Sequence, residues 1–134
     1  MIRVIMGKKG TGKTKQMIDM INQAVQSEHG NVVCIEKGDK LRFDINYQIR
    51  LVDSSQYDVA DYAAMRGFIS GLYAGNYDIT ELFLDGILRI TDHDMAAAAK
   101  VLNAIDKITS NIEVVVTVSA DAADLPEDLK KFVI

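Results

Sequence analysis

Cysteine, proline and tryptophan are nearly absent from this chain of 134 residues, which contains one cysteine, one proline and no tryptophan. The single cysteine, Cys34, excludes an intramolecular disulfide and a cysteine-ligated zinc cluster, and it favours a reducing cytoplasmic setting. One proline and nine glycines are too few for a long linker or a low-complexity segment. The length is typical of one domain, so we expect a single domain over residues 1–134.

Long hydrophobic runs and positive charge are also scarce. No run approaches the roughly 18 apolar residues that a membrane-spanning helix needs, so we expect no membrane partner. Lys and Arg number 15 against 19 Asp and Glu, and the resulting net charge of −4 argues against a nucleic-acid partner. A composition of 49% hydrophobic and 25% charged residues is ordinary for a globular protein and excludes wholesale disorder.

Short apolar runs alternate with segments of helical periodicity along the chain. The runs lie at residues 2–6, 31–36, 81–85 and 112–119, and the helical segments lie at residues 12–27, 62–72 and 95–105. Buried-type strands separated by helices predict an α/β fold with three layers, in which a parallel sheet carries helices on both faces. We also expect Thr91 with Asp94 to cap the third helix, and residues 131–134 to form a terminal strand.

Residues 41–51 have a different pattern, because an apolar residue occupies every odd position from Leu41 to Leu51. A period of two is typical of a half-exposed strand or a hairpin. We therefore expect a β-ribbon insertion at about residues 41–53, with a turn near residues 44–46. The polar face of this ribbon is basic, and we expect it to be solvated.

One motif points to chemistry. Residues 7–14 match G-x-x-x-x-G-K-[ST] at every required position, directly after a predicted strand and before a predicted helix. Glycines let backbone N–H groups turn toward phosphate oxygens, and the following helix adds the positive end of its dipole. Lys13 supplies a charge for the β- and γ-phosphates, and the Thr14 hydroxyl can ligate Mg²⁺. The predicted phosphate-binding residues are Gly7, Lys8, Lys9, Gly10, Thr11, Gly12, Lys13 and Thr14.

On this motif the chain resembles the P-loop NTPase superfamily. The resemblance implies a carboxylate for the Mg²⁺ shell at the end of an apolar strand, and Leu82-Phe83-Leu84-Asp85 looks like this Walker B element. Many of these ATPases carry a glutamate directly after that aspartate, whereas this chain has Gly86. The RecA-like branch is similar in this respect, and its pattern implies a catalytic base at the end of the next strand. Glu36 is then the first candidate base and Asp39 the second.

The resemblance extends to a strand that presents a polar residue near the γ-phosphate, for which Thr117 and Ser119 are candidates. The overall pattern is also similar to small bacterial proteins described as ATP-binding or as related to twitching-motility ATPases. An arginine often neutralises charge in phosphoryl transfer. Arg42, Arg50, Arg66 and Arg89 are available for this role, and the sequence does not select among them.

The sequence therefore predicts a protein that binds ATP and Mg²⁺ and hydrolyses ATP slowly, with Lys13 and Glu36 in catalytic roles and Asp85 at the metal. We expect the nucleotide to act through a second copy of the chain or another protein partner. Two alternatives stay open, a kinase of a nucleoside or small metabolite and a nucleotide-binding scaffold without hydrolysis. His29 and His93 have no partners at metal-ligand spacing, and we expect both to be structural or solvated.

Overall fold

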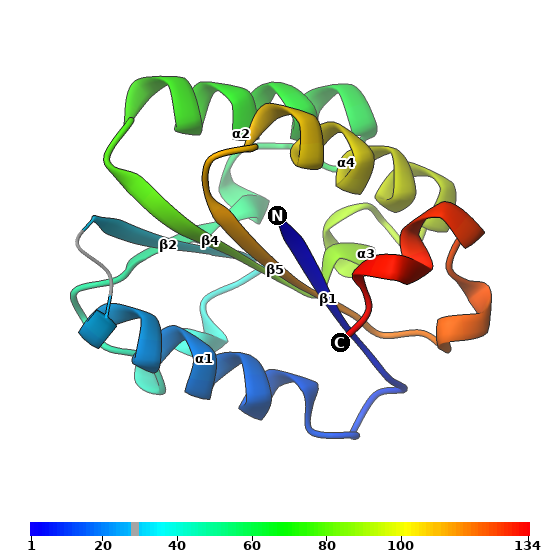
Figure 1. Cartoon of the computed structure of the whole chain (residues 1–134), viewed down its shortest axis with the longest axis horizontal. Helices are drawn as coiled ribbons and strands as arrows, with labels where there is room; N and C mark the ends of the chain where they lie inside the picture. Colours follow the sequence, from blue (N-terminus) through cyan, green and yellow to red (C-terminus); the bar gives the residue numbers. More distant parts are fainter. Residues whose placement is uncertain (28–29) are drawn as a thin grey trace.

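The computed structural model describes residues 1–27 and 30–134, and its centre is a sheet of five strands in the order β1-β5-β4-β2-β3. Every neighbouring pair of strands runs parallel (Figure 1). The strands are β1 (Ile2–Met6), β2 (Asn31–Glu36), β3 (Arg50–Asp53), β4 (Ile79–Asp85) and β5 (Glu113–Val118). The helices are α1 (Lys13–Ser27), α2 (Tyr62–Gly75), α3 (Ile87–Ile90) and α4 (Met95–Ile108).

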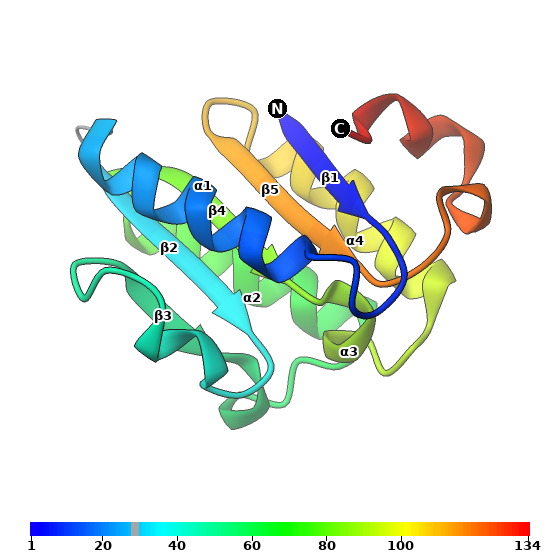
Figure 2. The ribbon, with the colours of Figure 1, turned by 90° about the horizontal axis from the view of Figure 1, so that it is seen from below.

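Helices cover both faces of this sheet, as the sequence predicted. Helix α1 lies on one face, and α2 and α4 lie together on the other (Figures 1 and 2). The strands β1, β2, β4 and β5 are mostly apolar between their ends because helices cover both faces of the sheet.

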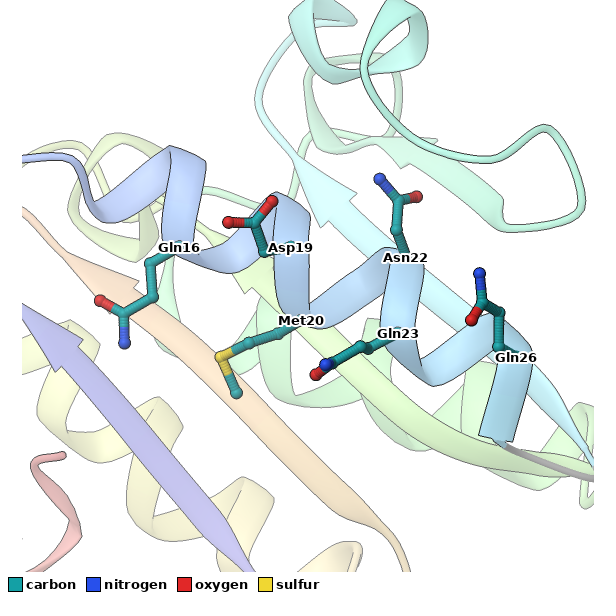
Figure 3. Close-up of a pocket in the computed structure, with 6 residues that line it drawn as sticks. All are labelled: Gln16, Asp19, Met20, Asn22, Gln23 and Gln26. Atoms are coloured by element: carbon teal, nitrogen blue, oxygen red, sulfur yellow. The ribbon is translucent and has the colours of Figure 1, made fainter.

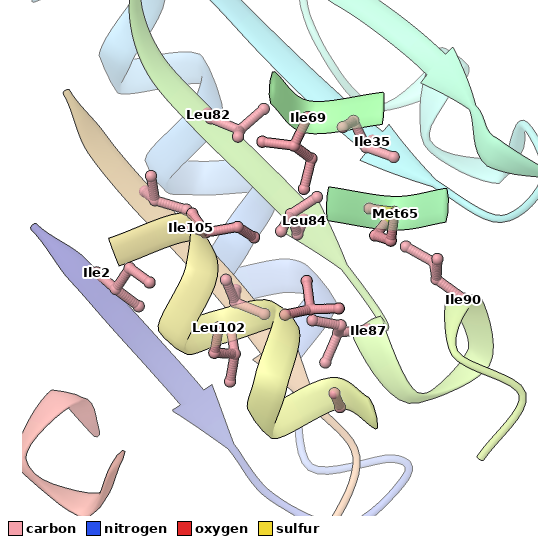
Figure 4. Packing of buried hydrophobic residues seen from close by; sticks show 14 of the residues in the cluster. Ile2, Ile35, Met65, Ile69, Leu82, Leu84, Ile87, Ile90, Leu102 and Ile105 are labelled. Carbon is pink, nitrogen blue, oxygen red and sulfur yellow. The ribbon is translucent and has the colours of Figure 1, made fainter. Parts of the chain in front are cut away.

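The core divides into two clusters, one on each side of the sheet. The larger one packs α2 and α4 on the strands, and Figure 4 shows Leu84 of β4 between the side chains of α2 and those of α4. The smaller one packs Met17 and Ile21 of α1 on the other face. Since side chains alternate along a strand, neighbouring strand residues belong to different clusters. This alternation decides which side chains at the strand ends point toward α1.

The predicted ribbon at residues 41–53 is wrong. Residues Lys40–Phe43 form a 3₁₀ turn, and β3 is a single strand that pairs parallel with β2. Leu41 and Ile49 are buried, and Ile45 and Leu51 are half-buried. The side chains between them, Phe43 and Tyr47, are 80% and 93% exposed. From residue 41 to residue 49, an apolar residue at every second position therefore coincides with burial at every fourth position.

Two smaller expectations also need correction. Residues Glu127–Phe132 form a 3₁₀ helix, and the terminal strand reduces to one parallel bridge between Val133 and Val4. Helix α4 is capped by Asp94, whose carboxylate accepts the Ala97 N–H at 3.1 Å. The Thr91 hydroxyl instead donates to the Ile87 carbonyl of α3, a helix that the sequence did not predict.

The remaining expectations for the fold concern the helix ends and the membrane. Helices α1 and α2 match their predicted ranges closely. His29 lies outside the described residues. Among the helices of the described residues, none has the length and apolarity that a membrane crossing requires.

The core predicts a clear contrast between two aromatic side chains. Phe83 on β4 is fully buried in the α1-side cluster, whereas Tyr77 is 89% exposed. Phe83→Ala should lower the free energy of unfolding by about 3–5 kcal/mol, because it removes transfer energy and leaves a cavity. Tyr77→Ala should change it by less than about 0.5 kcal/mol. Urea denaturation of both variants measures the difference, and equal effects would contradict the packing described.

Candidate functional site

The loop between β1 and α1 is a tight turn that needs its glycines. Gly10 and Gly12 adopt φ values of +85° and +87°, a region that favours glycine. A Cβ atom on Gly7 would clash with the hydroxyl of Thr11. The Lys8 carbonyl accepts the Thr11 N–H at 3.2 Å and the Thr11 hydroxyl at 2.7 Å, which closes the turn.

Helix α1 begins directly after this loop and directs its first N–H groups outward. The first backbone bond into the helix runs from the Gln16 N–H to the Gly12 carbonyl at 3.1 Å, so the N–H groups of residues 13–15 precede the helical ladder. Lys13 is only 8% exposed, and its Nζ donates to the Lys8 carbonyl at 2.9 Å. A buried ammonium beside the positive end of a helix dipole makes this end of α1 a strong anion site.

Three strand ends face this loop on the same side of the sheet. Cys34, Phe83 and Val115 all belong to the α1-side cluster. The residues two positions further along their strands are Glu36, Asp85 and Thr117, and alternation places them on that same face. All three are at most 3% exposed. Polar side chains thus take the place of apolar ones on this face at the ends of β2, β4 and β5.

A cavity of about 580 Å³ lies between the loop and these strand ends. Of the residues predicted for the site, it is lined by Lys9, Gly10, Gly12, Lys13, Thr14, Glu36 and Asp85. Gly7, Lys8 and Thr11 shape the loop without lining the cavity, and the Lys8 ammonium lies 3.9 Å from Asp121. Asp39, the second candidate base, does not line it and pairs with Arg42 at 3.2 Å.

Positive charge is concentrated on this cavity although the chain is acidic. Its lining contains five cationic side chains and two carboxylates, while the whole chain has a net charge of −4. The cations are Lys9, Lys13, Lys15, Lys40 and Arg89. Sequence reasoning missed Lys15 and Lys40 as lining residues, since only the course of the segment after β2 brings Lys40 to the cavity. His93 also lines it.

Asp85 is held by the neighbouring strand. The Thr117 hydroxyl donates to Asp85 Oδ1 at 2.8 Å and accepts the Gly86 N–H at 2.7 Å. Of the two predicted candidates, Thr117 lies on β5 and makes both of these hydrogen bonds, whereas Ser119 follows the strand; both line the cavity. One hydroxyl fixes both the carboxylate and the turn that follows it.

Glu36 lies beside Asp85, because the two are register partners on β2 and β4. Its Oε1 accepts the Leu41 N–H at 3.0 Å, which ties the 3₁₀ turn to the strand end. Burial raises the pKa of Glu36, the Leu41 N–H opposes that rise, and the charge of Asp85 adds to it. Burial likewise raises the pKa of the Cys34 thiol well above its usual value, so this cysteine is a neutral core residue.

A second hollow, of about 520 Å³, lies along the outer surface of α1. Its six lining side chains fan out from the helix and do not converge on a common point (Figure 3). Five of the six are uncharged, and they offer neither a cationic cluster nor an apolar cleft. The cavity at the strand ends is the better candidate site.

The donor set at this cavity fits one kind of metal site only. Within residues 1–27 and 30–134, no group of three or more His, Cys, Asp or Glu side chains is placed to hold a metal ion. Mg²⁺ is commonly bound by one or two carboxylates together with phosphates and water. Asp85 and Thr14, facing a cationic loop, fit a metal that arrives with a polyphosphate.

Comparison of the sequence with models of known protein families gave no match. Comparison with characterised proteins gave none either. The interpretation of this site therefore depends on the motif at residues 7–14 and on the geometry around it.

The hydroxyl of Thr117 provides a test of how the site is held together. Thr117→Val should lower the free energy of unfolding by about 1–3 kcal/mol, because it leaves the Gly86 N–H and Asp85 Oδ1 without this partner. Thr80 on β4 is the matched control, since its buried hydroxyl has no hydrogen-bond partner among residues 1–27 and 30–134. Thr80→Val should be neutral or stabilising. Denaturant unfolding measures the stability of both variants. An unchanged stability of Thr117→Val would contradict the hydrogen bonds described between Thr117, Asp85 and Gly86.

Proposed function

We propose that the protein binds Mg-ATP in the cavity at the start of α1 and hydrolyses it slowly. The observation that carries this proposal is the clustering of five cations around a glycine loop that faces two buried carboxylates. A ligand with several negative charges and a bound divalent cation complements both parts of such a site. We place this activity in the cytoplasm, where Cys34 stays reduced.

The phosphates would lie against the loop and the first turn of α1. Lys13 would exchange the Lys8 carbonyl for phosphate oxygens, which are better partners for an ammonium. The N–H groups of residues 13–15 would add fixed donors. Thr14 and Asp85 would hold Mg²⁺, which neutralises the charge that develops on the phosphates.

Glu36 would act on the attacking water. The water oxygen bonds to the γ-phosphorus as the bond to the bridging oxygen breaks, and that electron pair leaves with ADP. Glu36 accepts a proton from the water and later releases it to solvent. Its raised pKa makes the carboxylate a better base than an exposed glutamate.

We further propose that hydrolysis is coupled to a protein partner or to a second copy of the chain. The cavity is open to solvent, and Arg89 beside it is 42% exposed. Water in the site weakens the electrostatic stabilisation of a transition state, so turnover by the chain alone should be slow.

Binding is tested first. Lys13→Ala should weaken Mg-ATP binding about 10- to 100-fold, because a charged hydrogen bond to phosphate contributes about 1.5–3 kcal/mol. Lys107→Ala, at an exposed position on α4, should leave the affinity unchanged. Isothermal titration calorimetry measures both. Absence of Mg-ATP binding to the unaltered chain, or an unaffected Lys13→Ala, would refute the proposal.

Replacing Glu36 by glutamine, the corresponding amide, tests its role as the base. Glu36→Gln should reduce hydrolysis about 10²- to 10⁴-fold, because the amide cannot accept the proton. Asp39→Asn should change the rate less than about twofold, since Asp39 does not line the cavity. Phosphate release at saturating Mg-ATP compares them. Equal rates for Glu36→Gln and the unaltered chain would exclude Glu36 as the base.

The raised pKa of Glu36 also predicts that the stability of the chain and its hydrolysis rate depend on pH. Because the pKa of Glu36 is raised in the folded state, its contribution to stability is largest at low pH and is lost as the pH rises through that pKa. Glu36→Gln should therefore become more stable than the unaltered chain toward neutral pH, with the difference shrinking in acid. Denaturation at acidic and neutral pH measures this trend. The hydrolysis rate of the unaltered chain should fall over the same interval as the carboxylate becomes protonated.

A further inference from the structure

Arg89 is the one arginine among the described residues that line the cavity, so the structure selects it from the four candidates in the sequence. Helix α3 positions it, because Ile87 and Ile90 are buried and direct the helix against the sheet. Gly86 precedes this helix with φ of +69°, and a Cβ there would lie 2.9 Å from Arg89 Nε. The guanidinium therefore lies close over Gly86, where the positive φ favours glycine and a side chain would push the guanidinium away.

The partner of Arg89 in this structure is Asp85. Arg89 Nη2 lies 3.5 Å from Asp85 Oδ2, at the long limit of a hydrogen bond. The other carboxylate oxygen, Oδ1, is held by Thr117 at 2.8 Å. Asp85 would thus keep its position if Arg89 moved away. A long contact with a side chain that is 42% exposed is also weak and exchangeable.

We propose that Arg89 has two successive partners, Asp85 before the nucleotide binds and the terminal phosphate of Mg-ATP afterwards. This inference depends on the proposed function. A divalent cation at Asp85 competes with the guanidinium for Oδ2, because two cations at one carboxylate oxygen repel each other. The released guanidinium remains at the cavity, where its planar fork suits phosphate oxygens. One chain then supplies its own arginine, and a second copy need not contribute one.

Three measurements test this, with Arg89→Ala and Arg89→Lys compared with Arg66→Ala on α2, which is exposed and does not line the cavity. The first measures Mn²⁺ binding in the presence of saturating ADP, because a polyphosphate completes the metal site. Arg89→Ala should bind this Mn²⁺ about two- to fivefold more tightly, because the competitor for Asp85 is gone. Electron paramagnetic resonance of free Mn²⁺ measures this. Unchanged or weaker Mn²⁺ binding would overturn the first half of the proposal.

The second measurement compares nucleotides by calorimetry. Arg89→Ala should weaken the binding of a non-hydrolysable Mg-ATP analogue about tenfold or more, and Mg-ADP should bind equally well or up to about fivefold more tightly. Arg89→Lys should recover only part of the difference, since an ammonium lacks the planar fork. Equal losses for the two nucleotides would overturn the assignment to the terminal phosphate.

The third measurement is hydrolysis. Arg89→Ala should lower kcat about 10³-fold or more, and the specific activity of the unaltered chain should not rise with protein concentration. An unaffected kcat, or activity that rises with concentration and survives Arg89→Ala, would overturn the inference while Mg-ATP binding still supports the proposed function. Failure of the unaltered chain to bind Mg-ATP would overturn both. Circular dichroism of each variant verifies that it is folded.

Discussion

Two buried carboxylates lie side by side at the ends of neighbouring strands, and the need to stabilise both of them is the constraint on which this site depends. Glu36 and Asp85 are register partners on parallel strands, and both point toward α1. Like charges in a poorly solvated place repel each other, so each needs a donor of its own. The Leu41 N–H donates a hydrogen bond to Glu36, and the Thr117 hydroxyl and the Arg89 guanidinium donate to Asp85.

These donors shape the surrounding chain. The bond from Leu41 fixes the 3₁₀ turn after β2, which brings Lys40 to the cavity. The bond from the Gly86 N–H to Thr117 fixes a left-handed turn after β4, and this turn aims α3 so that Arg89 reaches back to Asp85. The path of two loops thus follows from the need to satisfy two carboxylates.

The sequence was sufficient for the elements whose burial follows residue type. Apolar strands and amphipathic helices were placed well because each has its own period and the core fills both faces of the sheet. Residues 41–51 were misjudged because their apolar pattern is set by tertiary contacts. Leu41 and Ile49 enter the α1-side cluster, while Phe43 and Tyr47 alternate with them in type but not in burial. The site was predictable to the same degree: the loop, Asp85 and Glu36 could be named from a motif and from strand ends, whereas selecting Arg89 required the path of α3.

Net charge is a weak guide to this protein because charge acts locally. At physiological ionic strength the Debye length is about 8 Å, so acidic residues on the far side of the molecule barely affect an anion in the cavity. The five cations that line the cavity lie next to any anion bound there, and one of them, Lys13, is buried. A total of −4 argues against an extended nucleic-acid surface, which needs cations over a wide area. It has no bearing on a compact polyphosphate, because the same total is compatible with a strongly positive cavity when the acidic residues lie elsewhere.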